Sequence, residues 1–97
     1  MSGAAVDKEA VIAGLSPMKV SAGGYGGMIG VTTQQDACRK LLDRTTFSSR
    51  QMMIELQKAG APEAAAYRGA DRLLQKLRRA GVIRANRKKP SAGWDVV

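Results

Sequence analysis

The fold is decided by the last third of the chain, YRGADRLLQKLRRAGVIRANRKKPSAGWDVV, which runs from Tyr67 to Val97. In its first half, Leu73, Leu74 and Leu77 recur at the spacing of one face of an α-helix, which predicts that these leucines are buried. The expected helix runs from residue 62 to about residue 80. Its opposite face carries long hydrogen-bond donors, namely Arg68, Arg72, Gln75 and Arg79. The pattern therefore predicts a long amphipathic helix with a basic outer face.

A β-hairpin is expected directly after this helix. Gly81 suits the left-handed conformation found past a helix end, and two short β-prone segments follow at 82–85 and 94–97. The loop between them holds three adjacent cations, Arg87, Lys88 and Lys89. We expect Trp94, at the start of the last strand, to anchor this hairpin on the core.

Two further helices are expected before residue 62. The segment TTQQDACRKLLDR, residues 32–44, places apolar residues on one helical face, with Thr33 as the N-cap. Residues 45–47 form a short β-prone patch. The residues SSRQ at 48–51 can form a capping box that starts a second helix, which ends at Gly60. The link after Gly60 is so short that this helix and the next must cross steeply, as in a helix-turn-helix.

The inventory of reactive side chains argues against catalysis. The single cysteine, Cys38, falls on an apolar helix face, so we expect a core residue; the alternative is a reactive thiol in an exposed, electropositive setting. One cysteine and no histidine provide neither an internal disulfide nor a zinc or histidine-based centre within the chain. We therefore expect no cofactor, no metal site and no enzymatic activity.

Residues 1–32 differ from the rest. The stretch VDKEAVIAGL can form two or three helical turns, but SAGGYGGMIG, residues 21–30, has so many glycines that regular structure is costly. We expect a flexible glycine-rich arm over 1–32 and a folded domain over 33–97, so that deletion of residues 1–30 leaves a cooperative melt. The glycine run does not fit a dinucleotide loop, because Ile29 stands where glycine is needed.

The beginning of the sequence shows no export signal. No apolar run approaches the roughly 20 residues that a membrane-spanning helix needs. We therefore expect a soluble cytoplasmic protein without a membrane partner.

The net charge of +8 is concentrated in one region. Between Arg68 and Lys89 the chain has nine basic residues against Asp71 alone, whereas the charges of residues 1–32 cancel. Such a field attracts polyanions, of which nucleic acid is the commonest and anionic lipid the alternative. Solvated helix faces usually alternate in sign, so the imbalance favours contact with nucleic acid.

The order of these elements resembles the winged-helix family of DNA-binding domains. The resemblance covers residues 33–97. The stretch quoted first looks like the family's recognition helix, its Leu-x-x-x-Gly-Val-Ile exit and its wing, and TTFSSRQMMIEL, residues 45–56, looks like its short strand and second helix. It implies a mainly α-helical winged helix-turn-helix, with three helices and a small C-terminal β-hairpin, the wing.

The resemblance also implies which side chains meet DNA. The family's recognition helix usually inserts in the major groove, and its wing lies along the backbone or the minor groove. The positions that this marks as base-facing are Tyr67, Arg68, Arg72 and Gln75. The positions that it marks as backbone or wing contacts are Arg79, Arg84, Arg87, Lys88 and Lys89. Ala61 is a poor cap and residues 64–66 are alanines, so base contacts are expected to be few, supplemented by thymine-methyl contacts or DNA shape.

Three residues, two of these positions and Trp94, have an alternative role. Tyr67 can half-bury its ring beside the preceding helix, and Arg79 can complement the negative end of its own helix. Trp94 can stack on a base instead of anchoring the hairpin.

The expected function is sequence-directed binding to double-stranded DNA, as in a small bacterial or phage transcription regulator. The alternative is an architectural or protein-interaction winged-helix module within a replication, recombination or packaging assembly. We expect the N-terminal arm to add contacts to DNA or to recruit a partner, either another protein or a second copy in a homodimer.

Overall fold

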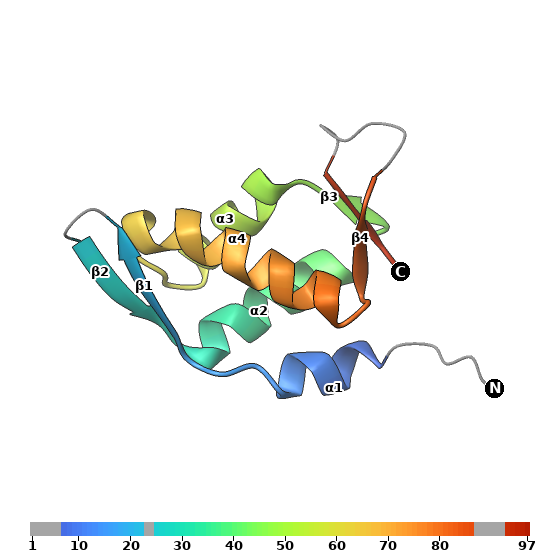
Figure 1. Ribbon diagram of the computed structural model, residues 1–97, viewed down its shortest axis with the longest axis horizontal. Coiled ribbons are helices and arrows are strands. Elements are labelled where there is room, and N and C mark those ends of the chain that lie inside the picture. The colour runs from blue at the N-terminus through green and yellow to red at the C-terminus, as the bar shows by residue number, and fades with distance from the viewer. Residues whose placement is uncertain (1–6, 23–24, 87–92) are drawn as a thin grey trace.

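The computed structural model describes residues 7–22, 25–86 and 93–97 (Figure 1). This part of the chain is mainly helical, with α1 Lys8–Ala13, α2 Val31–Leu42, α3 Ser49–Lys58 and α4 Glu63–Arg79. Its short strands are β1 Met18–Ala22, β2 Tyr25–Ile29, β3 Thr46–Phe47, β4 Ile83–Ala85 and β5 Trp94–Val96. They form two antiparallel sheets, one of β1 and β2 and one in the order β3-β5-β4. Figure 1 shows the two sheets near opposite ends of α4.

The helix signals in the second half of the chain are confirmed. Leu73, Leu74 and Leu77 of α4 are buried. The capping box of α3 is present, because the Ser48 hydroxyl accepts from the Gln51 amide N–H at 3.1 Å and the Gln51 side chain accepts from the Ser48 N–H at 2.8 Å. Gly60 and Gly81 have φ of 118° and 82°, as helix-terminating glycines do.

The hairpin after α4 is also confirmed. The pairs Ile83↔Val96 and Ala85↔Trp94 place these side chains on one face of the sheet, and Trp94 and Val96 pack against the core. The indole N–H of Trp94 donates to the Ser49 hydroxyl at 3.0 Å, which ties β5 to the start of α3. Trp94 therefore anchors the hairpin on the helices, as expected.

The prediction of a flexible arm over residues 1–32 is wrong where the structure describes them. Ile12 of α1, Met18 and Val20 of β1 and Ile29 of β2 are buried in the same core as the leucines of α4. The folded domain therefore begins well before residue 33, and it contains a fourth helix and a second sheet. Deletion of residues 1–30 removes these buried side chains, so we now expect it to abolish the cooperative melt.

Small residues on α4 make room for the β1–β2 hairpin. A Cβ atom on Gly69 would overlap the Cδ1 atom at the end of the Ile29 side chain, so any other residue would force that side chain to shift. Ala65 and Ala66 are buried as well. The sequence-based expectation that this alanine stretch is presented to DNA is therefore wrong for these two residues.

Helix α2 holds the N-terminal segment through side-chain amides. Gln34 is fully buried, and its side-chain N–H groups donate to the Ser16 carbonyl at 2.8 Å and to the Ile29 carbonyl at 3.0 Å. These two residues flank the hairpin at its base. Thr33 is not the N-cap of α2, which begins at Val31; its hydroxyl instead donates to the Ala59 carbonyl at 3.2 Å.

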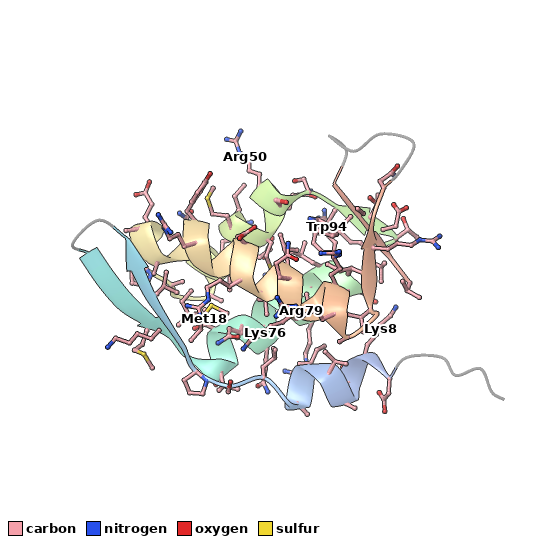
Figure 2. All side chains as sticks on the ribbon, in the orientation of Figure 1. Lys8, Met18, Arg50, Lys76, Arg79 and Trp94 are labelled. Atoms are coloured by element: carbon pink, nitrogen blue, oxygen red, sulfur yellow. The ribbon has the colours of Figure 1, made fainter. Side chains whose placement is uncertain are left out.

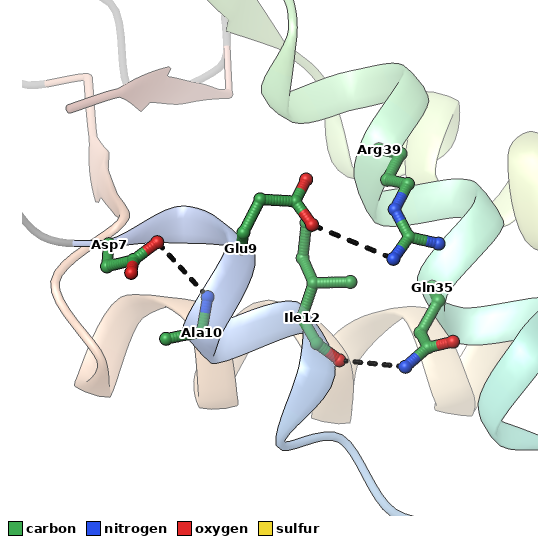
Figure 3. Close-up of polar contacts among 6 residues, drawn as sticks. All are labelled: Asp7, Glu9, Ala10, Ile12, Gln35 and Arg39. Atoms are coloured by element: carbon green, nitrogen blue, oxygen red, sulfur yellow. Dashed lines mark hydrogen bonds and ion pairs between the residues drawn. The ribbon is translucent and has the colours of Figure 1, made fainter.

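The contacts between α1 and α2 are shown in Figure 3. The Gln35 side chain donates to the Ile12 carbonyl at 3.1 Å, and Arg39 lies 3.7 Å from the Glu9 carboxylate. Asp7 caps α1 by accepting from the Ala10 N–H at 3.2 Å. The first helix is therefore a defined part of the domain.

Neighbouring residues of β2 provide a matched test of the docked hairpin. Ile29→Ala should lower the free energy of unfolding by about 2–5 kcal/mol, because the side chain fills a buried site against α4. Met28→Ala should change it by less than about 0.5 kcal/mol, because Met28 is 58% exposed. Urea unfolding followed by circular dichroism measures both values. Equal effects of the two substitutions would contradict the docking of β2.

The thiol of Cys38, on α2, provides a second test of the core. Burial raises the pKa of its thiol to about 12, and the nearby Arg39 offsets only part of that effect. We expect a thiol reagent at pH 8 to leave the folded protein unmodified and to react fully in denaturant, because the folded thiolate fraction is on the order of 10⁻⁴. The free energy of unfolding should also fall as the pH rises above the ordinary thiol pKa, since only the unfolded chain then releases this proton. Rapid labelling of the folded protein would contradict the assignment of Cys38 to the core.

Candidate nucleic-acid interface

The exposed side of α4 is basic and carries no ion pair within the described ranges. Its exposed cations are Arg68, Arg72, Lys76, Arg78 and Arg79. The ion pairs found in the described part of the chain lie elsewhere, between Glu9 and Arg39 and between Glu55 and both Lys40 and Lys58. The charges of α1, α2 and late α3 are thus partly neutralised, whereas those of α4 face solvent without a carboxylate partner.

A groove of about 640 Å³ runs between the start of α3 and the middle of α4. Ser49 and Arg50 line it from α3, and Tyr67 and Arg68 line it from α4, above the side chain of Met53. Figure 2 shows Arg50 projecting from the beginning of α3. The lining of the groove therefore combines three guanidinium groups, those of Arg50, Arg68 and Arg72, with hydroxyl donors, apolar side chains and the carboxylate of Asp71.

Arg50 is a candidate that the sequence analysis missed. It is the second residue of α3, so it lies beside the positive end of the helix dipole, where anions are stabilised. The signal was present in the sequence, because the capping box fixes where α3 begins and therefore places residue 50 in its first turn.

Two of the four base-facing candidates, Tyr67 and Arg68, have free side chains. Tyr67 is 73% exposed, so the alternative that its ring is half-buried is wrong. Arg68 is exposed, and within the described residues neither side chain has a hydrogen-bond or ion-pair partner. Both can reach a ligand without breaking an internal contact.

Arg72 and Gln75, the other two candidates, are engaged within the protein. Arg72 donates from Nη1 to the Lys19 carbonyl of β1 at 2.6 Å. The half-buried Gln75 accepts at Oε1 from Arg78 Nη1 at 3.0 Å. Neither bond could be predicted from helical spacing, because the first partner is distant in sequence and the second depends on a rotamer.

Of the five residues expected to contact the DNA backbone, only Arg79 and Arg84 lie in the described part of the chain. Arg79 is exposed at the end of α4, and Figure 2 shows it near Lys76 on this helix. Arg84 is exposed on β4, where it stands opposite Asp95 of β5. The three loop cations Arg87, Lys88 and Lys89 lie outside the described residues, so their contact with DNA stays a prediction.

The described residues do not suggest another kind of site. Across 7–22, 25–86 and 93–97, no group of three or more histidine, cysteine, aspartate or glutamate side chains is placed to hold a metal ion. Within the same ranges, none of the helices has the length and apolar character required to cross a membrane.

The bond between Arg72 and β1 predicts different effects for two neighbouring arginines. Arg72→Ala should cost about 0.5–1.5 kcal/mol of stability, because it removes the bond to the Lys19 carbonyl. Arg68→Ala should change stability by less than about 0.5 kcal/mol, because that side chain has no partner in the described structure. Thermal melts of the two variants against the wild type measure the difference. If both variants melt like the wild type, the bond to β1 contributes nothing.

Comparisons with protein-family models, with curated proteins and with solved structures give no match to this chain. The geometry and the charge distribution of the chain itself therefore indicate what it can bind.

Proposed function

We propose that the protein binds double-stranded DNA as a winged helix, with α3 and α4 as the helix-turn-helix and β4–β5 as the wing. The order helix, short strand, helix, tight turn, helix, hairpin supports this proposal, since it is the order on which the resemblance to winged-helix domains rests. The additional α1 and β1–β2 hairpin precede that unit in the chain.

The observation that carries the proposal is the contrast in charge between the two sides of the domain. The described cations of α4 have no carboxylate partner, whereas three carboxylate–cation pairs lie on α1, α2 and α3. Adjacent unpaired cations repel one another, and a polyanion that neutralises them relieves this repulsion. Duplex DNA supplies regularly spaced phosphates for such a surface, and the released counterions favour the complex.

The groove between α3 and α4 suggests which residues contact phosphates and which contact bases. Arg50, at the positive end of α3, suits a phosphate, which fixes the position of the protein without reading sequence. Arg68 is free on α4, and its planar guanidinium can grip the O6 and N7 acceptors of guanine. Sequence-directed binding, as in a small bacterial or phage regulator, therefore depends chiefly on Arg68 and on the neighbouring Tyr67.

A second candidate is an architectural module that contacts DNA with little sequence choice, within a replication, recombination or packaging assembly. It is favoured by the internal bonds of Arg72 and Gln75, which leave few free donors for base edges. The two candidates differ in the ratio of specific to non-specific affinity, which a selection from random duplexes followed by competition binding measures.

A charge-matched comparison tests the proposed surface. Arg50→Ala should weaken binding to every duplex and lower the slope of log affinity against log salt by about 0.9, the value for one phosphate contact. Lys40→Ala removes the same charge from α2 and should leave the slope unchanged, while Glu55 of α3 keeps its ion pair with Lys58. Fluorescence anisotropy with a labelled duplex over a salt series gives both slopes. If the wild type binds no duplex at low salt, the proposal is wrong.

Arg68→Ala separates readout of bases from attraction to the backbone. If Arg68 contacts a guanine, the variant should lose about 1–3 kcal/mol of discrimination at one base pair of the selected site. Competition with single-base variants of that site measures the loss. An equal loss of affinity for cognate and scrambled duplexes would show that Arg68 does not contact a base, and it would favour the architectural module.

A further inference from the structure

The β1–β2 hairpin is fastened to the domain at several levels. At its base, Gln34 donates to the carbonyls of Ser16 and Ile29 at 2.8 and 3.0 Å. At the same level, the Ile29 side chain packs into the space left by Gly69 of α4. Along its edge, the Lys19 carbonyl accepts from Arg72 at 2.6 Å. The hairpin is therefore a fixed part of the surface beside α4.

The direction of the hairpin follows from these contacts. Its base lies against Gly69, whereas the position of a Cβ atom on Gly27 is 3.5 Å from Ala65 Cβ and 3.7 Å from the ring of Pro62. Pro62 is the N-cap of α4, so the hairpin runs from the middle of α4 toward the beginning of that helix. Figure 1 shows β1 and β2 at this end of α4, away from β3 and β4.

The hairpin continues toward its turn beyond the point where Gly27 lies beside Pro62 and Ala65. Gly27 pairs with Val20, and two more pairs, Ser21↔Gly26 and Ala22↔Tyr25, follow toward the turn. At the rise of a β-strand, these pairs extend the ribbon about 7 Å beyond the Val20↔Gly27 pair. A helix-turn-helix reads DNA with the N-terminal residues of its second helix. The end of the ribbon near its turn therefore lies beside the part of α4 that would meet the DNA.

We infer that the β1–β2 hairpin is a second DNA-contacting ribbon, lying along the sugar–phosphate backbone beside the N-terminal half of α4. This inference rests on the proposed function. It assigns the two hairpins to opposite ends of α4, so that the helix docks between them. The N-terminal segment is then part of the binding surface.

The chemistry of the hairpin fits a phosphate backbone. The cross-strand pair Lys19↔Met28 is exposed on the face turned away from α4, and Lys19 offers an ammonium group there. The sequence has no acidic residue between Glu9 and Asp36, so no carboxylate of this segment repels a phosphate. Lys19 accepts the hydrogen bond from Arg72 with its backbone carbonyl, so the Lys19 side chain stays available for a phosphate.

Tethered cleavage tests the contact directly. Met28→Cys places a thiol on the exposed face of β2, and an iron chelate attached to it generates hydroxyl radicals beside the hairpin. The native Cys38 is buried and should stay unlabelled in the folded protein. Ala13→Cys, at the exposed end of α1, carries the same chelate as the matched control. We expect the position 28 conjugate to cut the bound duplex at one flank of the footprint, and the position 13 conjugate to leave it intact.

Lys19→Ala provides a second measurement. It should weaken binding to all duplexes and lower the log–log salt slope by about 0.9, with a melting temperature close to that of the wild type. If the Met28→Cys conjugate binds DNA without cutting it and Lys19→Ala keeps the full slope, the inference is wrong while the proposed function stands. If the unmodified protein binds no duplex, both are wrong.

Discussion

The contact between Ile29 of β2 and Gly69 of α4 is the constraint on which the arrangement of this domain depends. Helix α4 buries its leucines against the rest of the core on one side, and the bare backbone at Gly69 admits the hairpin on another. The apolar residues of the N-terminal third thereby reach the same core as the C-terminal leucines. A side chain at position 69 would displace the end of the Ile29 side chain from this site and disturb the packing of β2 on α4.

This constraint also explains which side of α4 is left for a ligand. The hairpin covers one flank of the helix and α3 covers another, so the exposed cations lie on the remaining strip and along its edges. Part of that strip is already engaged, because Arg72 and Gln75 have partners within the protein. The free guanidinium of Arg68 and the exposed ring of Tyr67 then form the centre of the candidate interface, and Arg50 extends it onto α3.

The second half of the fold could be predicted because its signals are local. A capping box, two helix-ending glycines and the spacing of the leucines each act within a few residues, and the structure confirms all of them. The N-terminal third was mispredicted because its stability comes from distant partners, above all the space beside Gly69. A weaker signal was present in the alternation of Met18, Val20 and Ala22 with polar residues, but the neighbouring glycines obscured it. At the candidate site, the helix pattern was enough to predict that the arginines of α4 are exposed. The bond from Arg72 to the carbonyl of Lys19, 53 residues earlier, could not be predicted from it.

The pairing of β3 with β5 has a consequence for the order in which the chain can fold. Among the described strands, β3 has β5 as its only neighbour, and the Thr46 hydroxyl donates to the Trp94 carbonyl across this pair. A growing chain on the ribosome carries β3 long before it carries β5. Phe47 is buried in the folded domain, but its strand cannot pair until β5 has been synthesised. Such long-range closure slows folding relative to a helical bundle, because the ends of a long chain segment must meet before the two strands can pair.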